Sequence, residues 1–359
     1  PGAVDLRVVR YSRRMTGQRY RGDWQYMVVP WYLVRRQKLD FDRGMCRRLW
    51  VEVQLSRDLR PGTYRGSLYV MLPEGRRTDV RVAVEVLPEL SVPTTDLDRV
   101  MVFYHQPFDR GNEAYGYSTY VQNTTGLPRE HARKIRRLFS EMNRTEMVAE
   151  MELLRKAGFT TLYFADWFPD CRRANESLRR PFRLEELILL RRRLVTREFP
   201  GPDRPCRVLV DTETRRAYLR ELPAYNEVTL GELRREGLKV YLGAPVEDLY
   251  MHESTVVNRL LSGLYLWRTN ADGVVFGPFR SNWGDPYHPF DGPSGEPGSF
   301  AVPSSQHWPT PNPSVQLEAV HQGVLDYTYL TVLEDLIRRA GNRPGTVEAR
   351  RMRSSSTVR

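Results

Sequence analysis

Residues 1–93 carry the alternation of apolar and polar side chains that is typical of half-buried β-strands. Residues 47–56 alternate in this way, a Pro61-Gly62 turn follows, and the alternation resumes over residues 64–72 and 79–86. No helical pattern separates these strands. The sequence therefore predicts an N-terminal domain of antiparallel strands, arranged as a β-sandwich, over residues 1–93.

From residue 94 the pattern changes to strands that alternate with helices, which is typical of parallel β/α units. The predicted strands lie near 99–105, 159–167, 207–211, 238–244 and 272–279, and the predicted helices include 129–158 and 183–199. Together they predict a TIM-like (β/α) barrel over residues 94–341. About five or six strands are convincing instead of the eight of a complete barrel, so the predicted barrel is shortened.

The final helix of this domain has the clearest ends. Asn312 is the predicted N-cap, Pro313 occupies the first helical position, and Gly341 is the predicted C-cap. An apolar stripe between these ends gives the helix one face that can pack against a core. Residues 342–359 have no apolar pattern and are predicted to form a disordered tail.

The charge of the chain is strongly basic, with 55 lysines and arginines against 44 aspartates and glutamates and a formal net charge of +11. Nearly all of the positive charge is arginine, and the arginines are spread through both halves, mostly beside acidic residues. No zinc-finger, ribonucleoprotein or helix-turn-helix pattern accompanies them. This distribution favours solvated basic surfaces over a nucleic-acid groove, and an arginine-driven binder of acidic polysaccharide is a weaker interpretation.

The sequence indicates no cofactor and no metal. The three cysteines, Cys46, Cys171 and Cys206, are odd in number and widely separated, which does not indicate a disulfide framework, although one bridge remains open. The six histidines show no metal-ligand spacing, and no glycine-rich nucleotide motif is present. No stretch approaches the ~20 consecutive apolar residues that a transmembrane helix needs, so no membrane partner is expected.

Five segments between residues 47 and 340 carry a family resemblance. They are LWVEVQLSRDLRPGTYRGSLYV, RLLSGLYLWRTNADGVVFGPF, GDPYHPFDG, FAVPS and PSVQLEAVHQGVLDYTYL. In this combination they resemble the bacterial proteins that carry domain of unknown function 4091, whose characterised relatives are the family 123 glycoside hydrolases. The resemblance implies a β-sandwich followed by a (β/α) barrel, and a carbohydrate partner.

The resemblance also implies a chemistry, the substrate-assisted hydrolysis of β-linked N-acetylhexosamine. In that family the acetamido oxygen of the sugar attacks the anomeric carbon, an Asp orients this amide, and the adjacent Glu is the general acid and base. Asp211, which ends the predicted strand 207–211, matches the orienting Asp. Thr212 stands where the family places its acid, and a Thr hydroxyl cannot act as a general acid near neutral pH.

Glu213 is the candidate for a displaced acid. Residues i and i+2 of an extended strand share a face, with Cα atoms about 6.5 Å apart, so Asp211 and Glu213 could enter one cleft. The alternative is that both carboxylates pair with Arg215 and Arg216 at a solvated strand end. The first interpretation predicts a catalytic pair and the second predicts an ordinary surface turn.

Other cleft candidates follow from the rule that barrel enzymes carry their sites at the carboxyl ends of the strands. Trp and Tyr rings stack on sugars, while His and Asp side chains hold hydroxyl groups. The predicted substrate-binding residues are Tyr104, His105, Asp166, Trp167, Trp283, Asp285 and Tyr287. For the aromatic members, packing at the top of the barrel is an equally good explanation.

Two functions follow for the whole chain. The first is a glycosidase that acts on N-acetylhexosamine-containing glycans, exported by a signal upstream of Pro1 to an extracellular or periplasmic location. The second is a barrel that has lost its chemistry and remains a glycan-binding or structural module, for which Thr212 and the shortened barrel are the motivation. The oligomeric state is left open.

Overall fold

The computed structural model describes residues 4–16, 25–35, 46–53, 59–71, 75–86, 97–103, 129–164, 168–220, 224–245, 254–277, 279, 300–302 and 310–340. The chain divides into two compact units. The smaller unit comprises Pro1–Arg7, Leu49–Thr94 and Val332–Arg359, and the larger unit comprises Val8–Arg48 and Thr95–Thr331. Much of the segment 8–48, predicted as part of a sandwich, thus groups with the α/β residues.

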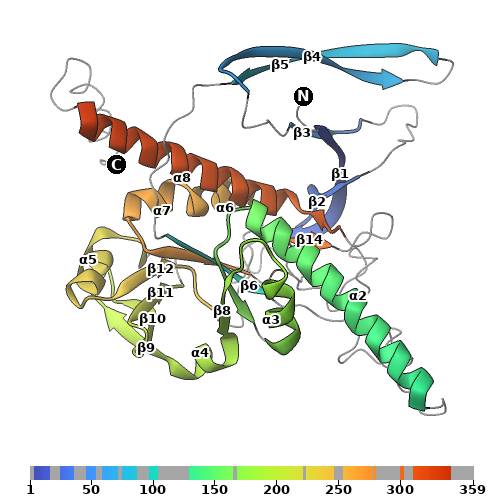
Figure 1. Cartoon of the computed structure of the whole chain (residues 1–359). Coiled ribbons are helices and arrows are strands. Elements are labelled where there is room, and N and C mark those ends of the chain that lie inside the picture. The colour runs from blue at the N-terminus through green and yellow to red at the C-terminus, as the bar shows by residue number, and fades with distance from the viewer. Residues whose placement is uncertain are drawn as a thin grey trace. The chain divides into compact units, whose positions relative to one another are not determined.

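The N-terminal strands are antiparallel where their pairing is described, as predicted (Figure 1). Strands β1 (Val4–Thr16), β2 (Gln25–Val34) and β3 (Leu49–Val53) form a sheet of order β2-β1-β3. Strands β4 (Gly62–Met71) and β5 (Arg77–Val86) pair with each other as a separate hairpin. The side chains of β3 alternate as predicted, but Leu49, Val51 and Val53 form its more exposed face.

The larger unit is built on one eight-stranded sheet of order β8-β7-β6-β13-β12-β11-β10-β9. The strands are β6 (Asp98–Phe103), β7 (Thr161–Phe164), β8 (Arg183–Glu186), β9 (Leu194–Phe199), β10 (Cys206–Asp211), β11 (Arg216–Leu219), β12 (Lys239–Leu242) and β13 (Gly273–Phe276). Neighbouring strands run parallel from β8 through to β11, whereas β10 is antiparallel to both β9 and β11. The sheet is therefore mostly parallel, with one reversed strand.

Side chains alternate between the two faces of this sheet, and each face is buried in its own way. We call the face that carries Val100, Tyr163, Tyr218 and Val275 the inner face, and the opposite face the outer face. The outer face contributes Met101, Leu162, Val240 and Phe276, among others, to the main hydrophobic core. Both faces are thus covered, which a parallel sheet requires because both of its sides are normally buried.

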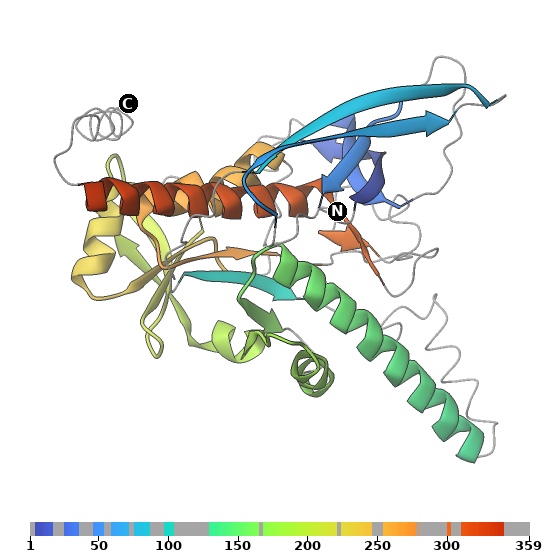
Figure 2. The ribbon, with the colours of Figure 1, turned by 45° about the horizontal axis from the view of Figure 1, so that its top comes forward.

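The helices are distributed unequally between the two faces (Figures 1 and 2). They are α2 (Arg129–Lys156), α3 (Phe168–Glu176), α4 (Leu187–Arg193), α5 (Glu227–Arg235), α6 (Thr255–Ser262), α7 (Leu264–Thr269) and α8 (Val315–Ala340). The outer-face core includes Leu154 of α2, Leu230 of α5 and Val320 of α8. Among the described helices, only α4 places side chains, Leu187 and Leu190, in the inner-face cluster.

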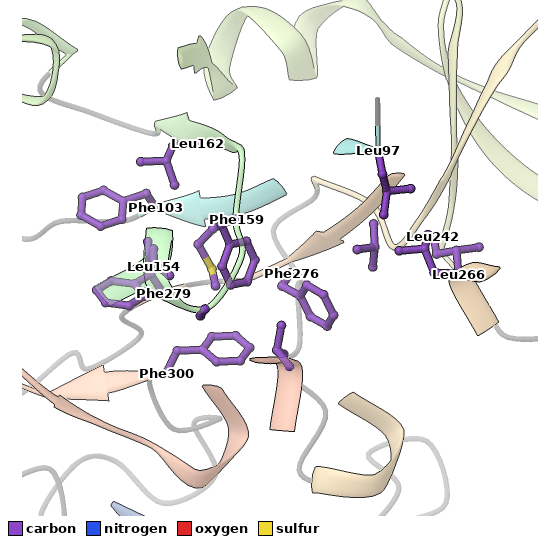
Figure 3. Packing of buried hydrophobic residues seen from close by; sticks show 14 of the residues in the cluster. Leu97, Phe103, Leu154, Phe159, Leu162, Leu242, Leu266, Phe276, Phe279 and Phe300 are labelled. Atoms are coloured by element: carbon purple, nitrogen blue, oxygen red, sulfur yellow. The ribbon is translucent and has the colours of Figure 1, made fainter. Parts of the chain in front are cut away.

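Aromatic rings fill the outer-face core at the point where β6, β7 and β13 end. Phe103 stacks on Phe279 with 5.2 Å between ring centroids and meets Phe164 edge-on at 5.3 Å. Phe276 makes edge contacts with Phe159 and Phe300 (Figure 3). Rings at these separations add to the burial energy of the core, so they anchor the strand ends.

Two predicted helices differ from their predictions. The segment 183–199 is not one helix but β8, the short helix α4 and β9, because Cys206–Asp211 pairs with Leu194–Phe199 across a turn that contains Gly201. Helix α8 begins at Val315, and its N-cap is Ser314, whose Oγ accepts a hydrogen bond from the Leu317 N–H at 3.2 Å. The predicted cap residues Asn312 and Pro313 instead form β15, which pairs with β14 (Ala301–Val302).

The other well-defined elements agree with the sequence. Helix α2 covers the predicted segment and is followed by Gly158, whose φ of +96° suits a glycine at a helix end. The predicted strands near 99–105, 207–211, 238–244 and 272–279 all exist as β6, β10, β12 and β13. Gly341 and the predicted tail 342–359 lie outside the described residues.

Gly323 of α8 allows this helix to pack closely against α6, and this close packing leads to a prediction. A Cβ at position 323 would overlap the carbonyl oxygen of Arg259 and the hydroxyl of Ser262, whereas a Cβ at Gly231 of α5 would meet only the end of the Arg235 side chain. We expect Gly323→Ala to lower the free energy of unfolding by about 1–3 kcal/mol. Gly231→Ala, also inside a helix, should raise it by about 0.5–1 kcal/mol.

Urea unfolding followed by circular dichroism measures both variants. Equal stabilisation by the two alanines would show that α6 and α8 are not in close contact at Gly323.

Candidate functional site

Charged and tyrosine side chains gather on the inner face at the edge where the parallel strands begin, which we call the amino edge. Parallel strands start at the same edge, so their first residues become neighbours. The first and third residues of a strand point to the same face, and in these strands that face is the inner one. The first residues are Asp98, Thr161, Arg183 and Arg216, and the third residues are Tyr163, Glu185, Tyr218 and Tyr241. We call these eight residues the amino-edge layer.

Asp98 accepts hydrogen bonds from four groups of this region. Its Oδ1 atom accepts from the hydroxyls of Thr161 at 2.5 Å and Thr160 at 3.0 Å. Its Oδ2 atom accepts from the Tyr241 hydroxyl at 3.0 Å and forms an ion pair with the Arg183 guanidinium. The Asp98 side chain is only 6% exposed, so these donors replace the water that a buried carboxylate loses.

A second group of contacts joins strands that are not neighbours in the sheet. Arg216 of β11 donates to Glu185 of β8 at 2.6 Å, and the hydroxyls of Tyr163 and Tyr218 lie 3.0 Å apart. Four strands separate β8 from β11. In a flat sheet these two strands would lie about 24 Å apart, at ~4.8 Å per strand, which no Arg–Glu pair can span. The sheet is therefore strongly curved around its inner face.

Burial shifts the pKa values of the tyrosines in this layer. Desolvation raises the pKa of Tyr163 far above its ordinary value, and the neighbouring Tyr218 and Glu185 add to the effect. Burial also raises the pKa of Tyr218 and of Tyr241, and Asp98 contributes to the second shift. Burial acts to lower the pKa of Arg216, but Glu185 together with Tyr163 and Tyr218 raises it overall. The layer thus combines neutral phenols with guanidinium–carboxylate pairs.

Asp211 also lies at the amino edge, which corrects the expectation that it stands at the carboxyl end of a parallel strand. Because β10 runs against its neighbours, its last residue pairs with Arg216, the first residue of β11. Asp211 is completely buried. Barrel geometry associates this edge with stability and the opposite edge with chemistry.

The Asp211 carboxylate organises the hairpin between β10 and β11. Oδ1 accepts from the backbone N–H groups of Glu213 at 3.0 Å and Thr214 at 3.3 Å, and Oδ2 accepts from the Thr214 hydroxyl at 2.7 Å. Arg193 donates to the same Oδ2 at 3.1 Å. Arg215 completes the turn with a positive φ of 54°. These are the bonds of an Asx-type turn in a hairpin loop, in which an Asp side chain satisfies the turn's N–H groups.

Glu213 lies beside Asp211 but differs from it in exposure. Its side chain is 67% exposed, and its carboxylate lies 3.3 Å from Nη1 of Arg193. The prediction that Arg215 and Arg216 neutralise the two acids is wrong, because Arg216 pairs with Glu185 and Arg215 donates to backbone carbonyls. Arg193, at the end of α4, is the shared cation instead.

The opposite edge, where the parallel strands end, is the carboxyl edge. Strands β6, β7 and β13 end there side by side, since Phe103 pairs with Phe164 and Phe276 pairs with Met101. The predicted substrate-binding residues follow these three strands along the chain. Tyr104, His105, Asp166, Trp167, Trp283, Asp285 and Tyr287 themselves lie outside the described residues.

The sequence interpretation missed β11, the strand that brings a further segment to the carboxyl edge. Its last residue, Leu219, is followed by Arg220 and Glu221, of which Glu221 lies outside the described residues. The sequence does carry a signal for β11. The segment 212–215 is a short polar stretch between two runs that contain apolar residues, which is the pattern of a hairpin turn. The hairpin was missed because Asp211 was interpreted as the end of a parallel strand.

The described residues contain no group of three or more His, Cys, Asp or Glu side chains placed to hold a metal ion. None of the described helices is long and apolar enough to cross a lipid bilayer. No known protein-family model and no curated protein sequence matches the chain. The described geometry therefore defines the class as a mixed α/β protein with a mostly parallel eight-stranded sheet.

The two carboxylates of the hairpin should respond differently to substitution. Asp211→Ala leaves Arg193, the Thr214 hydroxyl and two backbone N–H groups without their acceptor, so we expect a loss of about 2–4 kcal/mol in the free energy of unfolding. Glu213→Gln should cost less than about 1 kcal/mol, because the Glu213 carboxylate is largely exposed. Urea denaturation of both variants measures the difference, and equal costs would contradict the structural role of Asp211.

The buried tyrosines predict a loss of stability in alkali. Their pKa values are higher in the folded chain than the unfolded value of about 10, so their contribution is complete below pH ~10 and is lost as the pH rises above it. Each such tyrosine lowers the free energy of unfolding by up to ~1.4 kcal/mol per pH unit in this range. Urea midpoints between pH 8 and 11 measure the slope.

Tyr218→Phe should make this alkaline slope shallower. Tyr329→Phe is the matched control, because the Tyr329 side chain is 60% exposed. Identical slopes in the wild type and in Tyr218→Phe would refute the contribution of the layer.

Proposed function

We propose that this chain is a glycan-binding protein of the glycoside-hydrolase-like class, in which Asp211 organises a hairpin and neither Asp211 nor Glu213 cleaves a sugar. The observation that carries the proposal is the direction of β10. It places Asp211 at the amino edge, while the aromatic and acidic candidates follow strands that end at the carboxyl edge. An Asp–Glu pair at the amino edge could not act on a sugar bound at the carboxyl edge.

A barrel-like closure of the sheet supports this assignment. Strands β6, β7 and β8 are neighbours in the order of the chain, and so are β9 to β13. Because β13 pairs with β6, the strands would follow one another in chain order around a ring. The ring is interrupted in the described residues between β8 and β9, and α4 connects these two strands. The bonds from β8 to β11 and from β7 to β11 cross the interior of such a ring. We propose a TIM-like barrel with one reversed strand and one open seam.

The amino-edge layer suggests from which side a ligand would enter this barrel. Asp98, Glu185, Arg216 and the three tyrosines bond to one another, so they leave little capacity to bind a sugar at the amino edge. The inner face toward the carboxyl edge is lined by Val102 and Val275, with Leu187 and Leu190 of α4 in the same cluster. A glycan would therefore bind at the carboxyl edge, and Trp167 and Trp283, which follow β7 and β13 in the sequence, are the aromatic candidates to test.

Hydrolysis is the second candidate function, and β11 is the observation that favours it. This strand is parallel to β12, so the residues that follow it leave from the carboxyl edge. Glu221 is the carboxylate closest in sequence to the end of that strand. If the chain cleaves an N-acetylhexosamine glycoside, Glu221 would be the general acid, and Glu213 would not.

Binding and turnover are tested together on one set of variants. We expect saturable binding to N-acetylhexosamine-containing glycans on an array. Trp167→Ala or Trp283→Ala should weaken it about tenfold, because an aromatic contact contributes about 0.5–1.5 kcal/mol beyond its buried area and about 1.4 kcal/mol corresponds to tenfold. Glu213→Gln is the control and should bind as the wild type does. An array without hits would remove the proposal.

Aryl 2-acetamido-glycosides supply the test for turnover. If the aryl group is not released, the result supports a protein that binds glycans without cleaving them. Release that Glu221→Gln abolishes and Glu213→Gln leaves unchanged supports the hydrolase, and release that depends on Glu213 would contradict the structural assignment of the hairpin.

A further inference from the structure

Arg155, in the last turn of α2, holds its guanidinium in a fixed position. Its Cζ atom lies 3.7 Å from the centroid of the Phe182 ring, and Nη1 donates to the Phe159 carbonyl at 3.0 Å. Phe182 is itself held by Asn175, which accepts from the Phe182 N–H at 2.7 Å and donates to its carbonyl at 3.0 Å. Arg155 is therefore oriented by a rigid aromatic platform and one backbone acceptor.

The remaining edge of the Arg155 guanidinium has no acceptor in the part of the chain that the structure describes. Nε and Nη2 are both buried, and neither makes a hydrogen bond there. These two N–H groups form the side-on fork that binds two oxygens of a carboxylate, sulfate or phosphate at once. Buried charged donors without partners are costly, so this fork favours a ligand that supplies acceptor oxygens.

The surroundings of this fork are positive. Burial lowers the pKa of Arg155, and the nearby positive charge of Arg180 lowers it further. Arg180 is exposed, and no described carboxylate forms an ion pair with it. Two guanidinium groups that repel each other and lack an acid attract an anion.

Other arginines at the start of the sheet provide the contrast. Arg183 pairs with Asp98, Arg193 pairs with Asp211, and Arg216 pairs with Glu185. Each of them has its counter-charge within the described chain. Among these neighbouring arginines, Arg155 and Arg180 stand out because their partner is not supplied by the described residues.

We propose that Arg155 and Arg180 form a binding site for a tetrahedral oxyanion, a sulfate or phosphate group. Because Nε and Nη2 of Arg155 are covered in the unliganded chain, the atoms over them move aside when two oxygens of the anion accept from this edge. The nearby positive charge of Arg180 then faces the remaining oxygens. The anion is either a free ion or an ester on a saccharide. This site does not rest on the carbohydrate-binding proposal, since neutral glycans require no such group.

Isothermal titration with sodium sulfate and sodium phosphate tests the site, with sodium chloride at equal ionic strength as the reference for screening. We expect saturable binding that Arg155→Met weakens at least tenfold and that Arg180→Met weakens several-fold. Arg192→Met is the matched control, because Arg192 is an exposed arginine on α4, and it should bind as the wild type does. No binding beyond the chloride reference, or an equal loss in the Arg192→Met variant, would overturn the proposal.

Thermal unfolding tests the site separately from the Arg155→Met variant, which could fail to fold. Sulfate should raise the melting temperature of the wild type and the Arg192→Met variant more than that of Arg180→Met, whose substitution is at the surface. An equal rise in all three would overturn the site. N-acetylglucosamine 6-sulfate separates the two sources of the anion: binding at least tenfold tighter than sulfate assigns an ester on a sugar, and equal affinity assigns a free oxyanion.

Discussion

The curvature of the large sheet depends on a few ionic and phenolic contacts across its inner face. The pair between Glu185 and Arg216 and the contact between Tyr163 and Tyr218 join strands that a flat sheet would hold far apart. Burying such charges costs desolvation energy, and removing one partner of a buried pair typically costs about 3–5 kcal/mol. These contacts are satisfied only when the strands curve in one way, so they select the curved form of the sheet over flatter alternatives.

The open seam of the proposed barrel, between β8 and β9, is part of the same arrangement. These two strands are the edges of the sheet, and α4, which connects them, places Leu187 and Leu190 in the inner-face cluster. Arg193, at the end of α4, then bonds to the hairpin that Asp211 organises. In the proposed barrel, α4 would join the two edge strands through hydrophobic contact, and Arg193 would link this helix to Asp211 and Glu213 of the hairpin.

Much of the fold could be predicted from local patterns, because apolar periodicity reports where strands and helices are. It predicted α2 and the strands β6, β10, β12 and β13. Periodicity carries no information on strand direction, however, so the reversal of β10 and the edge on which Asp211 lies could not be derived from it. The segment 183–199 failed for a related reason: its leucines fit a helix, while its pairing with β10 depends on a tertiary contact. Of the candidate site, the sequence identified Asp211 and Glu213 as neighbours but could not identify Arg193 as their common partner.

The reversed strand also affects the order in which the sheet can assemble. Strands β9, β10 and β11 form a meander of short connections within residues 194–219, whereas the pairing of β13 with β6 joins segments about 175 residues apart in the chain. Contacts of low sequence separation close at little entropic cost, and those of high separation close slowly. Sequence separation therefore predicts that the meander forms early and that the pairing of β13 with β6 forms late. The amino-edge layer, to which β6 contributes Asp98, is then complete only after that late pairing.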